Sequence, residues 1–132
     1  MAVLVAEAVP GRDRLARILD GRDVEFASTC AEARVRLHER PYDLVVIGAH
    51  FDSSTALDLI QEVLRGEATC PVICVHCVPF ATPSARRSFE AFRLASSALG
   101  AAEVLNLLEF PDDEAGNARV RRMLERMMEV ER

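Results

Sequence analysis

The chain has 132 residues, half of them apolar, and a formal net charge of −5. This length suits a single domain over residues 1–132 with a full core, and it is too short for two ordinary domains. The negative charge argues against a general nucleic-acid binder, which needs a basic face to release counterions. All 16 basic residues are arginine, so no reaction of this chain can use a lysine.

The beginning of the chain predicts a cytosolic protein. Met1 leads directly into an apolar segment, without the basic leader and small-residue cleavage site of a signal peptide. No apolar run approaches the roughly 20 residues that a membrane-spanning helix needs. In a reducing compartment the cysteines are expected to be free thiols. They are Cys30, Cys70, Cys74 and Cys77.

The first half of the chain predicts three strands, each followed by a helix. Short apolar or β-branched runs place the strands at 3–6, 24–27 and 44–47. Apolar residues at helical spacing fill the intervals, and Gly21 and Pro41 end the first two helices. Capping of the third helix is expected from Ser53, Ser54 or Thr55. Its predicted inward residues are Leu57, Leu59, Ile60 and Leu64.

The second half predicts two more strands, at 71–75 and 103–107. Between them, Pro83 begins a long helix that Gly100 ends. Asp112 or Asp113 is expected to cap the last helix. The inward residues of these two helices are predicted to be Phe89, Phe92, Ala95, Leu99, Val120, Leu124, Met127 and Met128.

Five strands that alternate with five helices predict an α/β fold with a doubly wound parallel sheet and helices on both faces. The expected strand order is 2-1-3-4-5. In this arrangement the ligand crevice lies at the carboxyl ends of the first and third strands.

Several segments, in this order and spacing, resemble the receiver domain of bacterial two-component response regulators over nearly the whole chain. The segments that carry the resemblance are 3–8, 41–47, 57–60, 71–73 and 100–103. The resemblance implies a flavodoxin-like fold and a role in two-component or phosphorelay signal transduction. It also implies a phosphoacceptor site at the end of the third strand.

The chemistry of that family is largely missing from this chain. Receiver phosphorylation uses a nucleophilic Asp, an acidic pair that holds Mg²⁺, a hydroxyl and a lysine. Aligned through the third strand, Gly48 stands at the acceptor, and Val104 replaces an aromatic residue that reports phosphorylation. The degenerate positions are Glu7, Ala8, Gly48, His76 and Leu107. The resemblance therefore implies a pseudo-receiver without catalytic residues or a bound cofactor, the Mg²⁺ site being lost.

Two other uses of the same region stay open from the sequence. Asp52 or Asp43 could serve as a displaced acceptor, although neither lies at the strand end. Glu7, His50, Asp52 and His76 could also form a His-His-carboxylate metal set.

Three further patterns have simpler explanations. Cys74 and His76 should share one strand face while Cys77 points to the other, so core packing is preferred to a zinc or redox motif. The residues 53–55 are better explained as a helix cap than as a phosphate-binding turn. The basic pairs and clusters at 86–87 and 119–122 are read as solvated helix faces, with an acidic partner surface as the alternative.

The segment from His76 to Gly100 is longer than a receiver requires and contains an apolar, proline-braced loop at 78–83. The face made by the fourth helix, fifth strand and fifth helix is the usual partner and dimer surface of the family. Candidate contact residues there are Phe80, Arg86, Arg87, Val104, Met123 and Met127, with core filling as the simpler role for the methionines.

The first functional hypothesis is a phosphorylation-independent signalling domain. It would act through a protein partner, and a homodimer is possible. The second is a small-ligand or metal sensor that uses the vacated pocket around Glu7, Gly48, His50 and His76. An enzyme is the weakest reading, because no nucleophile, base and orienting group can be assembled.

Overall fold

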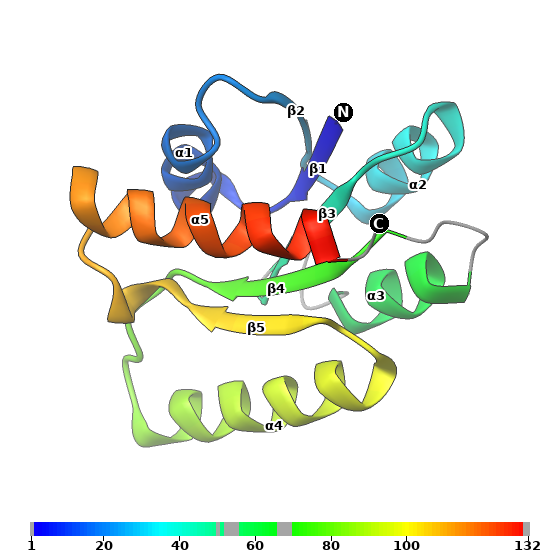
Figure 1. Ribbon diagram of the computed structural model, residues 1–132. Coiled ribbons are helices and arrows are strands. Elements are labelled where there is room, and N and C mark those ends of the chain that lie inside the picture. The colour runs from blue at the N-terminus through cyan, green and yellow to red at the C-terminus, as the bar shows by residue number, and fades with distance from the viewer. Residues whose placement is uncertain (1, 50, 52–55, 66–69, 131–132) are drawn as a thin grey trace.

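The protein is described by a computed structural model that covers residues 2–49, 51, 56–65 and 70–130 (Figure 1). Its centre is a five-stranded parallel sheet in the order β2-β1-β3-β4-β5. The strands are β1 Ala2–Ala6, β2 Asp23–Ala27, β3 Leu44–Gly48, β4 Val72–His76 and β5 Glu103–Asn106. The predicted doubly wound α/β fold and its strand order are confirmed.

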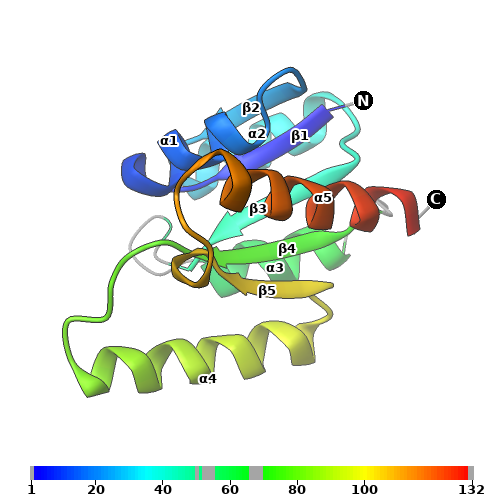
Figure 2. The same cartoon turned by 60° about the vertical axis from the view of Figure 1, so that its left-hand side comes forward.

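Helices cover both faces of this sheet. They are α1 Val9–Ile18, α2 Cys30–Glu39, α3 Ala56–Arg65, α4 Pro83–Leu99 and α5 Glu114–Val130, with a short 3-10 helix, η1, at Leu107–Glu109. Figures 1 and 2 show α1 and α5 together on one face, with α2 and α3 on the other. Helix α4 packs beside α3 and along β5 at the sheet edge.

The apolar runs of β1, β3 and β4 are buried on both sides, as parallel strands require. Successive side chains alternate between two clusters. Leu4 and Ile47 point toward α2, α3 and α4, whereas Val5 and Val46 point toward α1 and α5. Because β1, β3 and β4 pair in parallel, their carboxyl ends lie at one edge of the sheet.

Local capping fixes the helix boundaries that the sequence predicted. The Thr82 hydroxyl accepts a hydrogen bond from the Ala85 amide at 3.0 Å, one residue before Pro83. Gly100 ends α4 with a φ of +113°, which only glycine adopts without strain. Asp113 is the acid that caps α5, because its carboxylate accepts from the Gly116 amide at 2.7 Å.

Three boundaries and faces differ from the predictions. Leu64 is 36% exposed, and Val63 takes the inward position on α3. Strand β4 extends through His76, and β5 ends at Asn106 because the Asn106 side chain accepts from the amide of the next-but-one residue and starts η1. Leu107 is therefore outside the strand. The predicted helix caps at 53–55 lie outside the described residues.

Within the described segments, no helix combines the length and the apolar character needed to cross a bilayer.

Candidate functional site

The end of β3 lies beneath the side chain of Glu7. Strand pairing sets Ala6 beside Ile47, so Glu7 and Gly48 are the next neighbours along β1 and β3. A Cβ atom added to Gly48 would overlap the Glu7 carboxyl group, including both of its oxygens. An acceptor side chain at position 48 would therefore need the space that Glu7 already occupies.

Glu7 is enclosed on its other sides as well. It is 5% exposed, and a Cβ atom on Gly11 of α1 would lie only 2.6 Å from its Oε2. Oε1 accepts a hydrogen bond from the Ala8 amide at 2.7 Å, and Oε2 accepts one from the Cys77 thiol at 3.7 Å. Burial raises the pKa of Glu7, and these two hydrogen bonds lower it by less.

This arrangement corrects the expectation of a widened opening at the strand ends. Glycine at position 48 removes the side chain that would stand at the acceptor, but the Glu7 carboxyl group fills the space it leaves. The predicted ligand pocket around Glu7, Gly48, His50 and His76 therefore lacks its central opening, and His50 lies outside the described residues.

The remaining degenerate positions face different surroundings. Ala8 is exposed, and Leu107 is fully buried at the start of η1. His76 is 2% exposed, and its ring stacks on Phe80 with centroids 4.5 Å apart. Val104 is half-buried against the cluster under α2, α3 and α4. Of these side chains only Glu7 is acidic, and it points to β3.

The alternative phosphoacceptors find no support at this edge of the sheet. Asp43 precedes β3, and its amide donates to the Ala2 carbonyl at 2.8 Å, which places it at the amino ends of the strands. It thus lies at the far end of β3 from Gly48. Asp52 lies outside the described residues.

The described residues do not fit the Mg²⁺ site that the resemblance implies. Mg²⁺ needs an octahedral set of oxygen ligands and keeps several waters. Glu7 is instead buried and hydrogen bonded, and in the described part of the chain no three His, Cys, Asp or Glu side chains gather as a metal site. His76 packs against aromatic rings, and the other two candidate ligands, His50 and Asp52, are not described.

The cysteines near this region are packed as apolar residues. Cys74 is buried against the cluster under α2 and α3, and Cys77 is half-buried against the opposite cluster. Burial raises the pKa of both thiols to about 12. No disulfide links the four cysteines, all of which lie in the described part of the chain.

Arg14 of α1 is a buried cation that sequence reasoning missed. It is 8% exposed, and its guanidinium donates to the carbonyls of Leu107 at 2.7 Å, Phe110 at 2.7 Å and Pro111 at 3.1 Å. It also donates to the side-chain oxygen of Asn117 at 3.0 Å. One side chain thereby fastens α1 to the connection between β5 and α5. Its position four residues before inward-facing Ile18 was the available signal.

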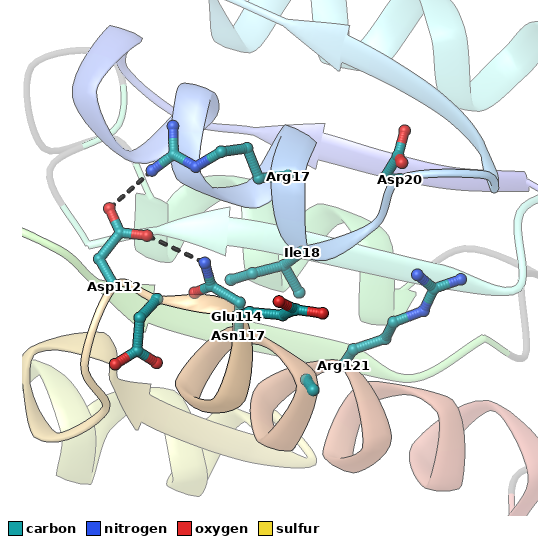
Figure 3. Close-up of a pocket in the computed structure, with 9 residues that line it drawn as sticks. Arg17, Ile18, Asp20, Asp112, Glu114, Asn117 and Arg121 are labelled. Carbon is teal, nitrogen blue, oxygen red and sulfur yellow. Dashed lines mark hydrogen bonds and ion pairs between the residues drawn. The ribbon is translucent and has the colours of Figure 1, made fainter.

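A polar pocket of about 580 Å³ lies between α1 and the start of α5 (Figure 3). Arg17 donates to Asp112 at 2.6 Å, and Asp112 in turn accepts from the Asn117 amide group at 2.9 Å. Asp20, which follows the end of α1, and Arg121 of α5 line the same pocket (Figure 3). Because Arg17 and Asp112 lie 95 positions apart in the sequence, no local pattern predicted this pocket.

The candidate partner residues do not form one patch. Phe80 contacts His76 and carries the Arg86 guanidinium 4.9 Å above its ring, on the α4 side of the sheet. Met123 and Met127 pack, half-buried, against the cluster under α1 and α5. Phe80 and the two methionines therefore belong to opposite faces of the sheet. Exposed Arg87 and half-buried Val104 complete the set on the α4 side.

Solved structures share this arrangement of elements. The receiver domain of NtrX from Brucella abortus is 20% identical, matches over 98% of both chains and gives a TM-score of 0.72. A CheY-like receiver domain protein from Methanospirillum hungatei JF-1 is 14% identical over 98% of this chain and 94% of its own, with a TM-score of 0.70. A longer NtrX chain from Brucella abortus is 20% identical with a TM-score of 0.72, and this chain spans 26% of its length.

No family model and no curated protein matches the sequence. At these low identities the structural likeness establishes the fold, which is the CheY-like, flavodoxin-like arrangement of receiver domains.

Proposed function

We propose that this chain is a receiver-like domain of two-component signal transduction that acts by protein–protein contact and is not switched by aspartyl phosphorylation. The fold supports the receiver part of this proposal, because it matches receiver domains over nearly their whole length. The observation that carries the second part is the Glu7 carboxyl group, which occupies the space above Gly48.

The surroundings of Glu7 also oppose phosphoryl transfer. An acyl phosphate carries negative charge that Mg²⁺ and a lysine must neutralise. The chain has no lysine to neutralise this charge. The Glu7 carboxyl group would in addition lie against the oxygens of a phosphoryl group that approached Gly48. Arg14 does not substitute for the lysine, because carbonyl groups and Asn117 already accept its hydrogen bonds.

Treatment with acetyl phosphate and Mg²⁺ tests this proposal. We expect intact-protein mass spectrometry to show no phosphoryl adduct under conditions that modify an ordinary receiver domain in a parallel reaction. The Asp52→Asn variant serves as the matched control for a displaced acceptor. A stoichiometric adduct in the wild-type chain that disappears in Asp52→Asn would overturn phosphorylation independence.

For the partner we propose the face made by α4, β5 and α5, either for a signalling protein or for a second copy of this chain. Exposed Arg86 and Arg87 give the start of α4 a positive charge that suits an acidic partner. A homodimer through this face predicts a concentration-dependent mass in sedimentation equilibrium that Arg87→Glu shifts toward the monomer. A constant monomer mass would exclude the homodimer.

A further inference from the structure

A cavity of about 500 Å³ lies next to the filled site, between the start of α4, the 78–81 loop and the start of α3. Cavities that bind small molecules have volumes of roughly 300–1,000 Å³ and mostly apolar walls. Leu57 of α3, Phe80 of the loop, and Phe89 and Phe92 of α4 supply such walls here. The cavity is thus large enough for a compact organic molecule.

The aromatic wall of the cavity is built from rings that support one another. Phe80 stacks on His76 with an interplanar angle of 10°, and Phe89 packs against both, at 4.7 Å from His76 and 5.6 Å from Phe80. Rings fixed in this way lose little further freedom when a ligand ring packs on them. The wall therefore favours a flat aromatic ligand.

Two arginines lie beside the cavity, next to its lining residues Phe80 and Ala85, although they do not line it themselves. The Arg86 guanidinium lies 4.9 Å above the outer wall residue Phe80, and exposed Arg87 follows it. Ala85, in the first turn of α4, also lines the cavity, so the positive end of the helix dipole faces it. Among the described lining residues there is no carboxylate that would oppose an anion.

From these observations we propose that the cavity binds a small aromatic carboxylate, with its ring against Phe80, Phe89 and Phe92 and its carboxylate toward Arg86. Apolar contact supplies the ring's share of the binding, and the guanidinium selects the anion. The site would give the domain an input that needs no phosphorylation. The binding proposal rests on the cavity and does not depend on the proposed signalling function. A negative binding result would therefore leave the proposed function unaffected.

The test uses 2-naphthoate and its uncharged analogue naphthalene-2-carboxamide as probes of the full chain. We expect 2-naphthoate to produce saturable amide shifts in heteronuclear NMR spectra, centred on Ala49, Leu57 and Ser88, which line the cavity. The carboxamide should bind roughly fivefold more weakly, because it lacks the charge that Arg86 attracts. Absence of saturable shifts, or shifts centred elsewhere, would overturn the proposal.

Two pairs of variants separate this site from nonspecific binding. Ser88→Trp places a large ring into the cavity and should abolish binding of both probes, whereas Ser97→Trp, on the exposed far end of α4, should leave binding unchanged. Arg86→Gln should remove the preference for the anion, and Arg87→Gln should retain most of it. Unaltered binding to Ser88→Trp, or an Arg86→Gln protein that still prefers the anion, would contradict the assignment.

Discussion

At the carboxyl edge of the sheet, the region over β1 and β3 is closed while the region beside β4 and α4 is open. Over β1 and β3, the Glu7 carboxyl group fills the space between Gly11 and Gly48. Beside β4 the rings of His76, Phe80 and Phe89 form one wall of a cavity of about 500 Å³.

The comparison shows that glycine at a position such as 48 does not necessarily leave an empty space. Glycine at position 48 leaves space beside it, and Glu7, which follows β1, occupies this space and is hydrogen bonded there. Empty volume appears instead one strand away, where the loop after His76 leads into α4. Substitutions on the two sides should therefore have very different effects.

The largest effect is expected from Gly48→Asp, which places a carboxyl group at the position that the sequence resemblance assigns to the acceptor. The new side chain would overlap Glu7 and bring two carboxyl groups together in a buried space. We expect the free energy of unfolding to fall by about 3 kcal/mol at neutral pH. Urea denaturation followed by circular dichroism measures this loss.

A double-mutant cycle assigns the loss to Glu7. Glu7→Ala should remove the overlap, so the combined variant should be more stable than Gly48→Asp alone by at least about 1 kcal/mol. Gly48→Ala separates size from charge and should fall between wild type and Gly48→Asp. Equal stability of Gly48→Asp and the wild type would show that the region over β3 is open.

The next largest effect is expected from Arg14→Met, on the α1 side of the closed region. The substitution leaves the buried carbonyl groups of Leu107, Phe110 and Pro111 without their common donor. A loss of about 3 kcal/mol in the free energy of unfolding is expected. Arg17→Met is the matched control, because Arg17 lies exposed one turn on and pairs only with Asp112 at the surface. Similar losses of stability in both variants would show that the buried hydrogen bonds of Arg14 contribute no more than a surface ion pair does.

The sequence was sufficient for the sheet and for the ends of α4. Unbroken apolar runs specify strands buried on both faces, and Pro83 and Gly100 act locally on the chain. In each case the signal lies within a few neighbouring residues.

The sequence could not predict in the same way that the Glu7 side chain occupies the space beside Gly48. The position of Glu7 depends on Gly11 and Gly48 together, and the second glycine lies some forty positions away. The cavity depends on how Phe80 folds back on His76, which the 78–83 loop decides. Such contacts arise from tertiary packing, for which composition and periodicity carry no signal.

A smaller, pH-dependent effect is expected from Glu7→Gln. Because burial raises the pKa of Glu7, the folded protein keeps its proton to higher pH than the unfolded chain does. Stability from this group is therefore lost as pH rises from the unfolded pKa through the folded one. Glutamine does not ionise; its one side-chain oxygen can still accept from the Ala8 amide, and its NH2 group can donate to the Cys77 sulfur.

We thus expect Glu7→Gln to match the wild type near pH 4 and to exceed its free energy of unfolding by about 1 kcal/mol at neutral pH. Thermal and urea unfolding across this pH range measure the difference. Glu109→Gln, at an exposed position, is the control and should show no such trend. A Glu7→Gln variant that loses stability as pH rises as steeply as the wild type would contradict the raised pKa of the buried Glu7.

The smallest effect is expected on the open side, from Phe80→Ala. Phe80 is half-buried and packs on His76 and Phe89, but its neighbours in the 78–81 loop are exposed. Loss of these ring contacts should lower the free energy of unfolding by about 1 kcal/mol. Leu94→Ala, a substitution of an apolar residue that is 64% exposed on α4, should have almost no effect. If Phe80→Ala were as destabilising as Gly48→Asp, the aromatic wall would belong to the core, and the contrast between a closed and an open side would fail.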